Sequence, residues 1–390
     1  MDFTQLLKVM VDRGASDLFV TAGAAPSIKV DGTIRPLTKE TLKPSQTRAL
    51  VYSTMNDKQL AEFEGTSECN FAISAPGIGR FRVSAFMQRN TPGMVLRSIN
   101  NHIPSMDELK LPTVLRDLSM TKRGLILFVG GTSTGKSTSL ASMIDYRNDN
   151  HAGHIITIED PIEYIHSHKK SIITQREVGI DTESFEVALK NTLRQAPDVI
   201  LMGEIRSAET MKYALAFAET GHLCLATLHA NNANQALDRI ISFFGPEHHD
   251  QVWMDMSLNL KAIIAQQLLP TVDGKGRRAA IEVMINTPLI QDHVRKGEVH
   301  EIKEVIKKST NLGMRTFDQA LFELYRDGVI TYEVALAHAD SANDLRLMIK
   351  LDAETSGNKD VKQESDMPSF TLQEEEDNLN IDGDLGIKGM

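Results

Sequence analysis

The feature that most constrains this chain of 390 residues is the run GGTSTGKS at Gly130–Ser137. It fits the pattern G-x-x-x-x-G-K-[ST], in which glycines let several backbone N–H groups face one phosphate. The apolar run LILFV precedes it and the helical run STSLASMIDY follows it, as a strand–loop–helix phosphate site requires. The sequence therefore predicts an α/β fold with nucleotide bound by Gly130, Gly131, Thr132, Ser133, Thr134, Gly135, Lys136, Ser137 and Thr138.

Two side chains of this loop have direct roles in the predicted chemistry. The Lys136 ammonium would reach the β- and γ-phosphates, and the Ser137 hydroxyl would be a Mg²⁺ ligand. ATP and Mg²⁺ are therefore the expected cofactors.

Acidic residues follow two further apolar runs. The run DVILMG is followed by Glu204, which would lie at the carboxyl edge of a parallel sheet, close to the loop. There it would align Mg²⁺ through water or accept a proton from the attacking water. The run HIITI is followed by Glu159, Asp160 and Glu163, which would complete the metal and water shell. The alternative for this group is a charge cluster at a helix N-terminus, with Pro161 at its first position.

Four histidines have weaker signals. His222 and His229 flank the run LCLATL, and a straight strand does not bring both of its ends to one site. From the residues alone, each is interpreted as a satisfied core or turn histidine. His166 and His168, in HSHKK, favour a surface loop over a metal site.

The length predicts two domains and an extra segment, because a single core seldom exceeds roughly 250–300 residues. Residues 1–100 are predicted to form a small α/β domain, and 101–112, with two prolines, a linker. Over 113–285, apolar runs alternate with amphipathic helices, which indicates a mostly parallel sheet covered on both faces. Residues 286–350 are predicted to be helical. The strands expected in the sheet are Gly124–Gly130, His154–Ile158, Asp198–Gly203 and His222–Leu228.

The charge is concentrated in the last segment, 351–390. Of the net charge of −10, eleven acids and three lysines from Asp352 onward contribute −8. The segment is predicted to be a disordered acidic tail, with a tethered docking segment as the alternative. The nearly neutral body lacks the basic field that nucleic-acid binding needs, so no nucleic-acid partner is expected.

The sequence favours a cytoplasmic protein without direct membrane insertion. No run approaches the roughly 18 apolar residues of a membrane span, and the first residues read as an amphipathic helix, not a secretion signal. The two cysteines, Cys69 and Cys224, are expected to be buried free thiols, as suits a reducing compartment. Two cysteines cannot form a four-cysteine zinc site.

Four motifs in this order resemble the secretion-ATPase superfamily, and within it the type IV pilus retraction ATPases of the PilT/PilU family. The motifs span most of the ATPase part, and the resemblance covers about Met1–Leu351. They are GGTSTGKST at 130–138, TIEDPIEY at 157–164, DVILMGEIRSAET at 198–210 and TGHLCLATLHANNA at 220–233.

The resemblance implies a PAS-like N-terminal domain, a RecA-like ATPase domain and a ring-shaped homo-hexamer that hydrolyses ATP to power pilus retraction and twitching motility. Glu204 would be the catalytic glutamate and Glu163 would help to activate water, while His222 and His229 would sense the γ-phosphate. Partners would be a PilT-like sister ATPase and the inner-membrane pilus platform protein, with the ring peripheral to that membrane. Basic residues of the N-terminal domain would reach the phosphates. The candidates are Arg82 and Arg97, with surface ion pairing as the alternative; Arg194 and Arg206 are weaker candidates.

Two departures resemble the PilU-type accessory branch of this family. PilT-type motors carry AIRNLIRE after a Thr-Pro pair, whereas LIQDHVRK follows Thr287-Pro288 here, and the acidic tail extends beyond a minimal PilT-like body. Ser133 stands where the family usually has glycine, and its backbone N–H should still serve. Three other functions stay open: a nucleotide-gated adaptor ring that needs little hydrolysis, a fibre-assembly or secretion ATPase, which would usually have a zinc insert, and a P-loop kinase.

Overall fold

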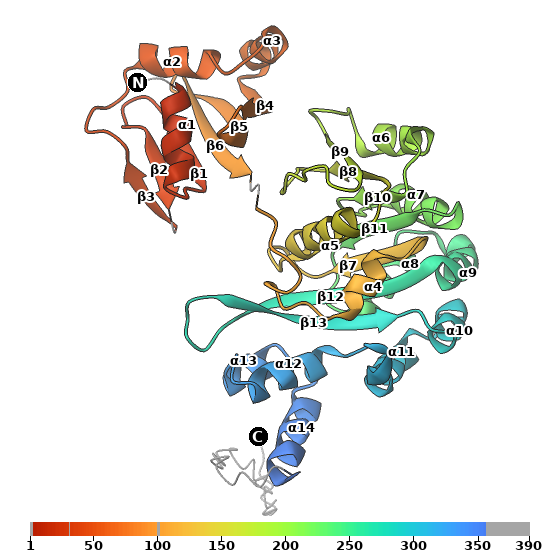
Figure 1. Cartoon of the computed structure of the whole chain (residues 1–390). Coiled ribbons are helices and arrows are strands. Elements are labelled where there is room, and N and C mark those ends of the chain that lie inside the picture. The colour runs from red at the N-terminus through yellow and green to blue at the C-terminus, as the bar shows by residue number, and fades with distance from the viewer. Residues whose placement is uncertain (1–2, 31, 100–101, 356–390) are drawn as a thin grey trace, which may run out of the picture. The chain divides into compact units, whose positions relative to one another are not determined.

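The computed structural model describes residues 3–30, 32–99 and 102–355 (Figure 1). Nearly all of the predicted acidic tail therefore lies outside the described residues. The chain divides into the units Met1–Leu345 and Arg346–Met390.

The first sheet belongs to the N-terminal part and is antiparallel, with six strands in the order β3-β2-β1-β6-β5-β4. In β5, Phe81, Val83 and Ala85 are buried while their neighbours are more exposed, so alternate residues face a core shared with Leu6 and Met10 of the first helix. The elements are α1 (Phe3–Asp12), β1 (Asp17–Val20), β2 (Ser27–Val30), β3 (Thr33–Pro36), α2 (Pro44–Tyr52), α3 (Asp57–Thr66), β4 (Glu68–Ala75), β5 (Gly79–Gln88) and β6 (Thr91–Ile99).

The second sheet carries the candidate site and has seven strands in the order β13-β12-β7-β11-β10-β8-β9. All neighbours pair in parallel except β12 and β13, which form an antiparallel hairpin. The mostly parallel sheet expected from the sequence is thus present. Its strands are β7 (Gly124–Val129), β8 (His154–Glu159), β9 (Ile172–Glu177), β10 (Val199–Met202), β11 (Leu223–Leu228), β12 (Leu260–Pro270) and β13 (Arg277–Ile285).

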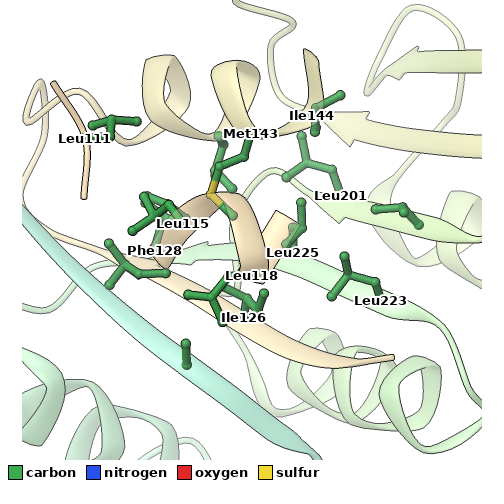
Figure 2. Packing of buried hydrophobic residues seen from close by; sticks show 14 of the residues in the cluster. Leu111, Leu115, Leu118, Ile126, Phe128, Met143, Ile144, Leu201, Leu223 and Leu225 are labelled. Carbon is green, nitrogen blue, oxygen red and sulfur yellow. The ribbon is translucent and has the colours of Figure 1, made fainter. Parts of the chain in front are cut away.

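Helices cover both faces of this sheet. On one face, Leu115 and Leu118 of α4 (Val114–Ser119) and Met143 of α5 (Lys136–Asn150) pack over Ile126 and Phe128 of β7 (Figure 2). On the other face lie α7 (Ala208–Glu219) and α8 (Ala233–Ile241). Every residue of β7 is buried, which explains its uninterrupted apolar run. The phosphate loop is therefore held between a fully buried strand and a packed helix.

The remaining described elements are helical, as the sequence predicts beyond the second sheet. They are α6 (Phe185–Thr192) and α9 (His249–Asn259), then α10 (Pro288–Lys296), α11 (Val299–Lys308), α12 (Phe317–Arg326), α13 (Tyr332–Ala337) and α14 (Ala342–Thr355). Among the described residues, no helix combines the length and apolar character needed to cross a membrane. Cys69 and Cys224 are free and buried, as expected. His166, expected on a surface loop, is instead buried.

Candidate active site

The phosphate loop occupies the turn from β7 into α5. The Lys136 ammonium donates hydrogen bonds to the carbonyl oxygens of Gly130, at 2.8 Å, and Gly131, at 2.7 Å. Burial lowers the pKa of Lys136, and the nearby Glu204 carboxylate partly offsets this effect. The loop therefore places a desolvated positive charge next to the N-terminus of α5, where an anion is best stabilised.

One loop residue adopts a backbone conformation that favours glycine. Ser133 has φ +62°, in the left-handed region where a side chain costs roughly 1–2 kcal/mol. This explains why glycine is usual at this position in the related ATPases. Serine at this position strains the loop but still provides a backbone N–H.

Parallel pairing brings the other predicted residues to the loop. Val129 lies beside Leu228 in the register of β7 and β11, and Met202 lies beside both Ala226 and Ile158. The carboxyl ends of these strands therefore meet at one sheet edge. A cavity of about 650 Å³ lies at that edge, within the size range of nucleotide sites. Of the predicted site residues, the cavity wall contains Thr132, Ser133, Thr134, Gly135, Lys136, Ser137, Thr138, Glu159, Asp160, Glu163, Glu204 and His229.

Glu204 is held by two cationic or polar partners. Arg206 Nε donates to its Oε2 at 2.8 Å, and His229 Nε2 lies 3.1 Å from its Oε1. The carboxylate is mostly buried, with 18% of its side chain exposed. Its orientation toward the cavity is thus fixed from both oxygens, as a general base requires.

Oxygen ligands suited to Mg²⁺ line the same cavity. Ser137 supplies a hydroxyl, while Glu159 and Asp160 supply carboxylates. Burial raises the pKa of Glu159 to about 7, although a hydrogen bond from Thr157 Oγ1 opposes the shift. Among the described residues, no three His, Cys, Asp or Glu side chains converge into a metal cage. These oxygen atoms fit a hard cation such as Mg²⁺, which would take most of its other ligands from phosphate and water.

Five predicted residues do not line the cavity: Gly130 and Gly131, which begin the loop, and His222, Arg82 and Arg97. His222 precedes β11, whereas His229 follows it, and six residues at roughly 3.3 Å each separate the two ends. The Nδ1 atom of His222 lies 3.1 Å from Thr220 Oγ1 and 3.2 Å from Phe217 O. Within one subunit the length of β11 therefore separates His222 from the cavity that His229 lines, and a role of His222 in γ-phosphate sensing stays a prediction.

The two N-terminal arginines are also absent from the cavity wall. Arg97 forms an ion pair with Asp17 at 2.9 Å, which is the surface pairing considered as its alternative. Arg82 donates to Ile162 O at 3.3 Å and lies 3.7 Å from Glu177. Within a single chain, neither arginine therefore reaches the cavity in which phosphate would bind.

Sequence reasoning missed several residues in the cavity wall. Leu268 and Arg277 come from the β12–β13 hairpin, and Tyr164 hydroxyl lies 2.9 Å from Thr138 Oγ1. Of these three residues, Tyr164 stood within a recognised motif, TIEDPIEY. The hairpin residues have no local pattern that signals a nucleotide, because long-range pairing alone brings them to the loop.

A buried carboxyl supports the segment that follows His229. Glu282 of β13 is 2% exposed and accepts a hydrogen bond from Ala233 N, the first residue of α8, at 2.8 Å. Burial raises the pKa of Glu282 to about 7 from 4.5. The native state therefore holds a proton that the unfolded chain releases, and this contribution to stability is lost as pH rises from about 4.5 through about 7.

Glu282→Gln is expected to remove this pH dependence. Because the amide stays neutral, the stability of the variant relative to the wild type should rise by up to about 3 kcal/mol between about pH 5 and about pH 8. Denaturant unfolding at the two pH values measures the change. Glu301→Gln, at a half-exposed site on α11, is the control and should show no such rise. A Glu282→Gln difference that is the same at both pH values would contradict the assignment.

The fold and the site together define a RecA-like P-loop ATPase: a phosphate loop after a buried parallel strand, with an oriented glutamate on a neighbouring strand. The model of the family described as "Type II/IV secretion system protein" matches residues 2–321. The chain therefore belongs to the Type II/IV secretion system protein family, and within it to the type IV pilus ATPases.

Individual relatives agree with this assignment. The chain is 69% identical to the type IV pilus ATPase PilU of Pseudomonas aeruginosa, over 91% of this chain and 93% of that protein. It is 43% identical to the type IV pilus retraction ATPase PilT of the same organism, over 86% and 97%. A crystal structure of the pilus retraction motor PilT with bound ADP superposes with a TM-score of 0.83 at 41% identity, covering 89% of this chain and all of that one. The predicted fold, PAS-like and then RecA-like, and the predicted ATPase activity are thereby confirmed.

Proposed function

We propose that this chain forms a homo-hexameric motor that powers type IV pilus retraction, as the accessory ATPase that acts together with a PilT-type sister motor. The main support is the 69% identity to PilU along nearly the whole of both chains, against 43% to PilT. The ring would sit at the cytoplasmic side of the inner membrane, on the pilus platform protein. Residues 1–100, 101–112, 113–285 and 286–350 would be the N-terminal domain, linker, ATPase core and helical region.

The side chains that line the cavity would have different roles in the reaction. The loop N–H groups and Lys136 would bind the β- and γ-phosphates, and Ser137, Glu159 and Asp160 would hold Mg²⁺ directly or through water. The metal would neutralise the charge that develops on the phosphates.

Glu204 would accept a proton from the attacking water, oriented by His229. Glu163 would help to activate the water from the edge of the same cavity.

Other predicted residues would act across subunits. Arg82 and Arg97 would approach the nucleotide of a neighbouring subunit when the N-terminal domain closes over it. His222 would approach such a nucleotide from the ATPase core. Hydrolysis and product release would reopen the domain, and successive closures around the ring would move the platform.

The departure from the PilT pattern supports an accessory role. The segment LIQDHVRK lies on α10, which packs against α9 and contributes no residue to the nucleotide cavity. Within α10, Asp292 is paired with both Arg295, at 2.7 Å, and Lys296, at 2.6 Å. The change would therefore leave ATP chemistry intact and alter a surface through which the motor would transmit force.

The test measures mass and turnover of the full chain, alone and mixed with its PilT-type sister. A hexamer whose hydrolysis rises with the sister, and whose loss from cells weakens retraction under load, is the expected result. A chain that stays monomeric, or cells that retract normally without it, would overturn the proposal.

One other function fits the same cavity: a nucleotide-gated ring that supports the sister motor by binding alone. Lys136→Ala in cells that keep the sister distinguishes the two. Lost retraction supports the motor, whereas unchanged retraction with abolished turnover supports the adaptor.

A further inference from the structure

Gln266 lies on β12, yet its side chain contacts the phosphate loop and the helix that follows it. The residue is 2% exposed. Its Nε2 donates to Thr134 O at 2.8 Å, and its Oε1 accepts from Ser139 Oγ at 2.8 Å. The buried amide is thus used at both ends, and both partners belong to the segment that binds nucleotide.

The bond to Thr134 O determines which way the next N–H points. Thr134 C=O and Gly135 N–H belong to one planar trans peptide, so they point in opposite directions. Because Gln266 holds the oxygen on the strand side, the Gly135 N–H is turned away from the strand. Both Thr134 and Gly135 line the nucleotide cavity, and an N–H in this orientation is the donor that a phosphate needs.

The same residue explains two glycines of the motif. A Cβ at Gly135, which has φ +88°, would lie 2.7 Å from Gln266 Nε2, and a Cβ at Gly130 would lie 2.5 Å from Gln266 O. A Cβ does not approach nitrogen or oxygen this closely, so the loop or Gln266 would have to shift. The loop therefore packs closely against Gln266 at both Gly130 and Gly135.

We propose that Gln266 is a positioning residue for nucleotide binding, which preorganises the phosphate loop by anchoring the Thr134–Gly135 peptide. Without this anchor the loop samples other peptide orientations and must lose that freedom when the phosphates bind. The proposal rests on ATP binding by the loop and is independent of the role in pilus retraction.

The test uses the full-length chain and the dissociation constant of ADP with Mg²⁺. Gln266→Leu, which removes both hydrogen bonds at similar volume, is expected to weaken ADP binding about 10- to 100-fold, as lost preorganisation does. The kcat at saturating ATP should fall less, by about 3-fold or under, because Gln266 contacts neither Glu204 nor His229. A purely structural role would lower the melting temperature and leave the dissociation constant unchanged.

Matched variants separate the anchor from general packing. Gln266→Glu keeps the acceptor for Ser139 but turns a carboxylate toward Thr134 O, so it should bind ADP as weakly as Gln266→Leu. Gln267→Leu changes the next residue, whose side chain points to the opposite face of the strand, and should bind as the wild type does. If Gln266→Leu does not fold, Gln266→Glu and Ser139→Ala, which frees the other end of the amide, carry the test. Wild-type affinity in the folded Gln266 variants, or an equal loss in Gln267→Leu, would overturn the proposal.

Discussion

Glu204→Gln is expected to lower steady-state ATP hydrolysis about 1,000-fold, the size of a lost general base. The amide cannot take the proton from water, yet it is nearly isosteric. It can still accept one hydrogen bond, from His229 or from Arg206, which lie at 3.1 Å and 2.8 Å from the carboxylate. The dissociation constant for ATP should therefore stay within a few-fold of the wild type. Phosphate release and nucleotide titration of the same preparation measure the two effects.

The control is Glu209→Gln, which removes an exposed carboxylate from the first turn of α7, five residues further along the chain. Its turnover should match the wild type. If Glu204→Gln kept substantial turnover, the base would have to be another carboxylate of the cavity, and Glu163 would be the next to change.

The part of the site that the sequence predicted is the part encoded by local patterns. The phosphate loop is continuous in sequence, and the strand ends that carry Glu159, Glu204 and His229 follow from parallel pairing. Once one strand end is placed at a sheet edge, the topology places the others there as well. The loop and the acids were therefore predictable from the residues, whereas His229 was assigned to the site through the family resemblance alone.

The unpredicted part depends on contacts between distant segments. Gln266 is 132 residues from Thr134, and no periodicity relates the two. β12 and β13 are longer than the central strands, and the hairpin they form contributes Leu268 and Arg277 to the cavity. His222 illustrates the converse: the motif contains it, but the length of β11 separates it from the site.

The cavity also shows why the affinity and the rate of this ATPase should be separable. Two residues hold the phosphate loop in shape. Gln266 contacts it from β12, and Lys136 belongs to the loop itself. Glu204 and His229, the residues proposed to act on water, line the same cavity just after the ends of β10 and β11. Changes in the first group should act mainly on nucleotide affinity, and changes in the second mainly on kcat.

Among changes to the residues that act on nucleotide affinity, Lys136→Ala is expected to have the largest effect. Its ammonium is the positive charge that the loop brings to the cavity wall, and it donates hydrogen bonds to the carbonyls of Gly130 and Gly131. Loss of a charge-assisted contact to phosphate, together with loss of these hydrogen bonds, should weaken ATP binding by at least about 100-fold. Titration with ATP and Mg²⁺ measures it, with Lys122→Ala at an exposed position as the control.

For the same variant we also expect that the stability of the nucleotide-free protein does not fall. Because burial lowers the pKa of Lys136, the native state holds this charge less favourably than water does, and removing it should not destabilise the free protein. The melting temperature without nucleotide should be unchanged or higher. By contrast, the stabilisation that ATP gives the wild type, about 2.7 kcal/mol at a concentration 100 times the dissociation constant, should disappear. A variant that melts lower without ATP and is still stabilised by ATP would show that Lys136 supports the fold and not the nucleotide.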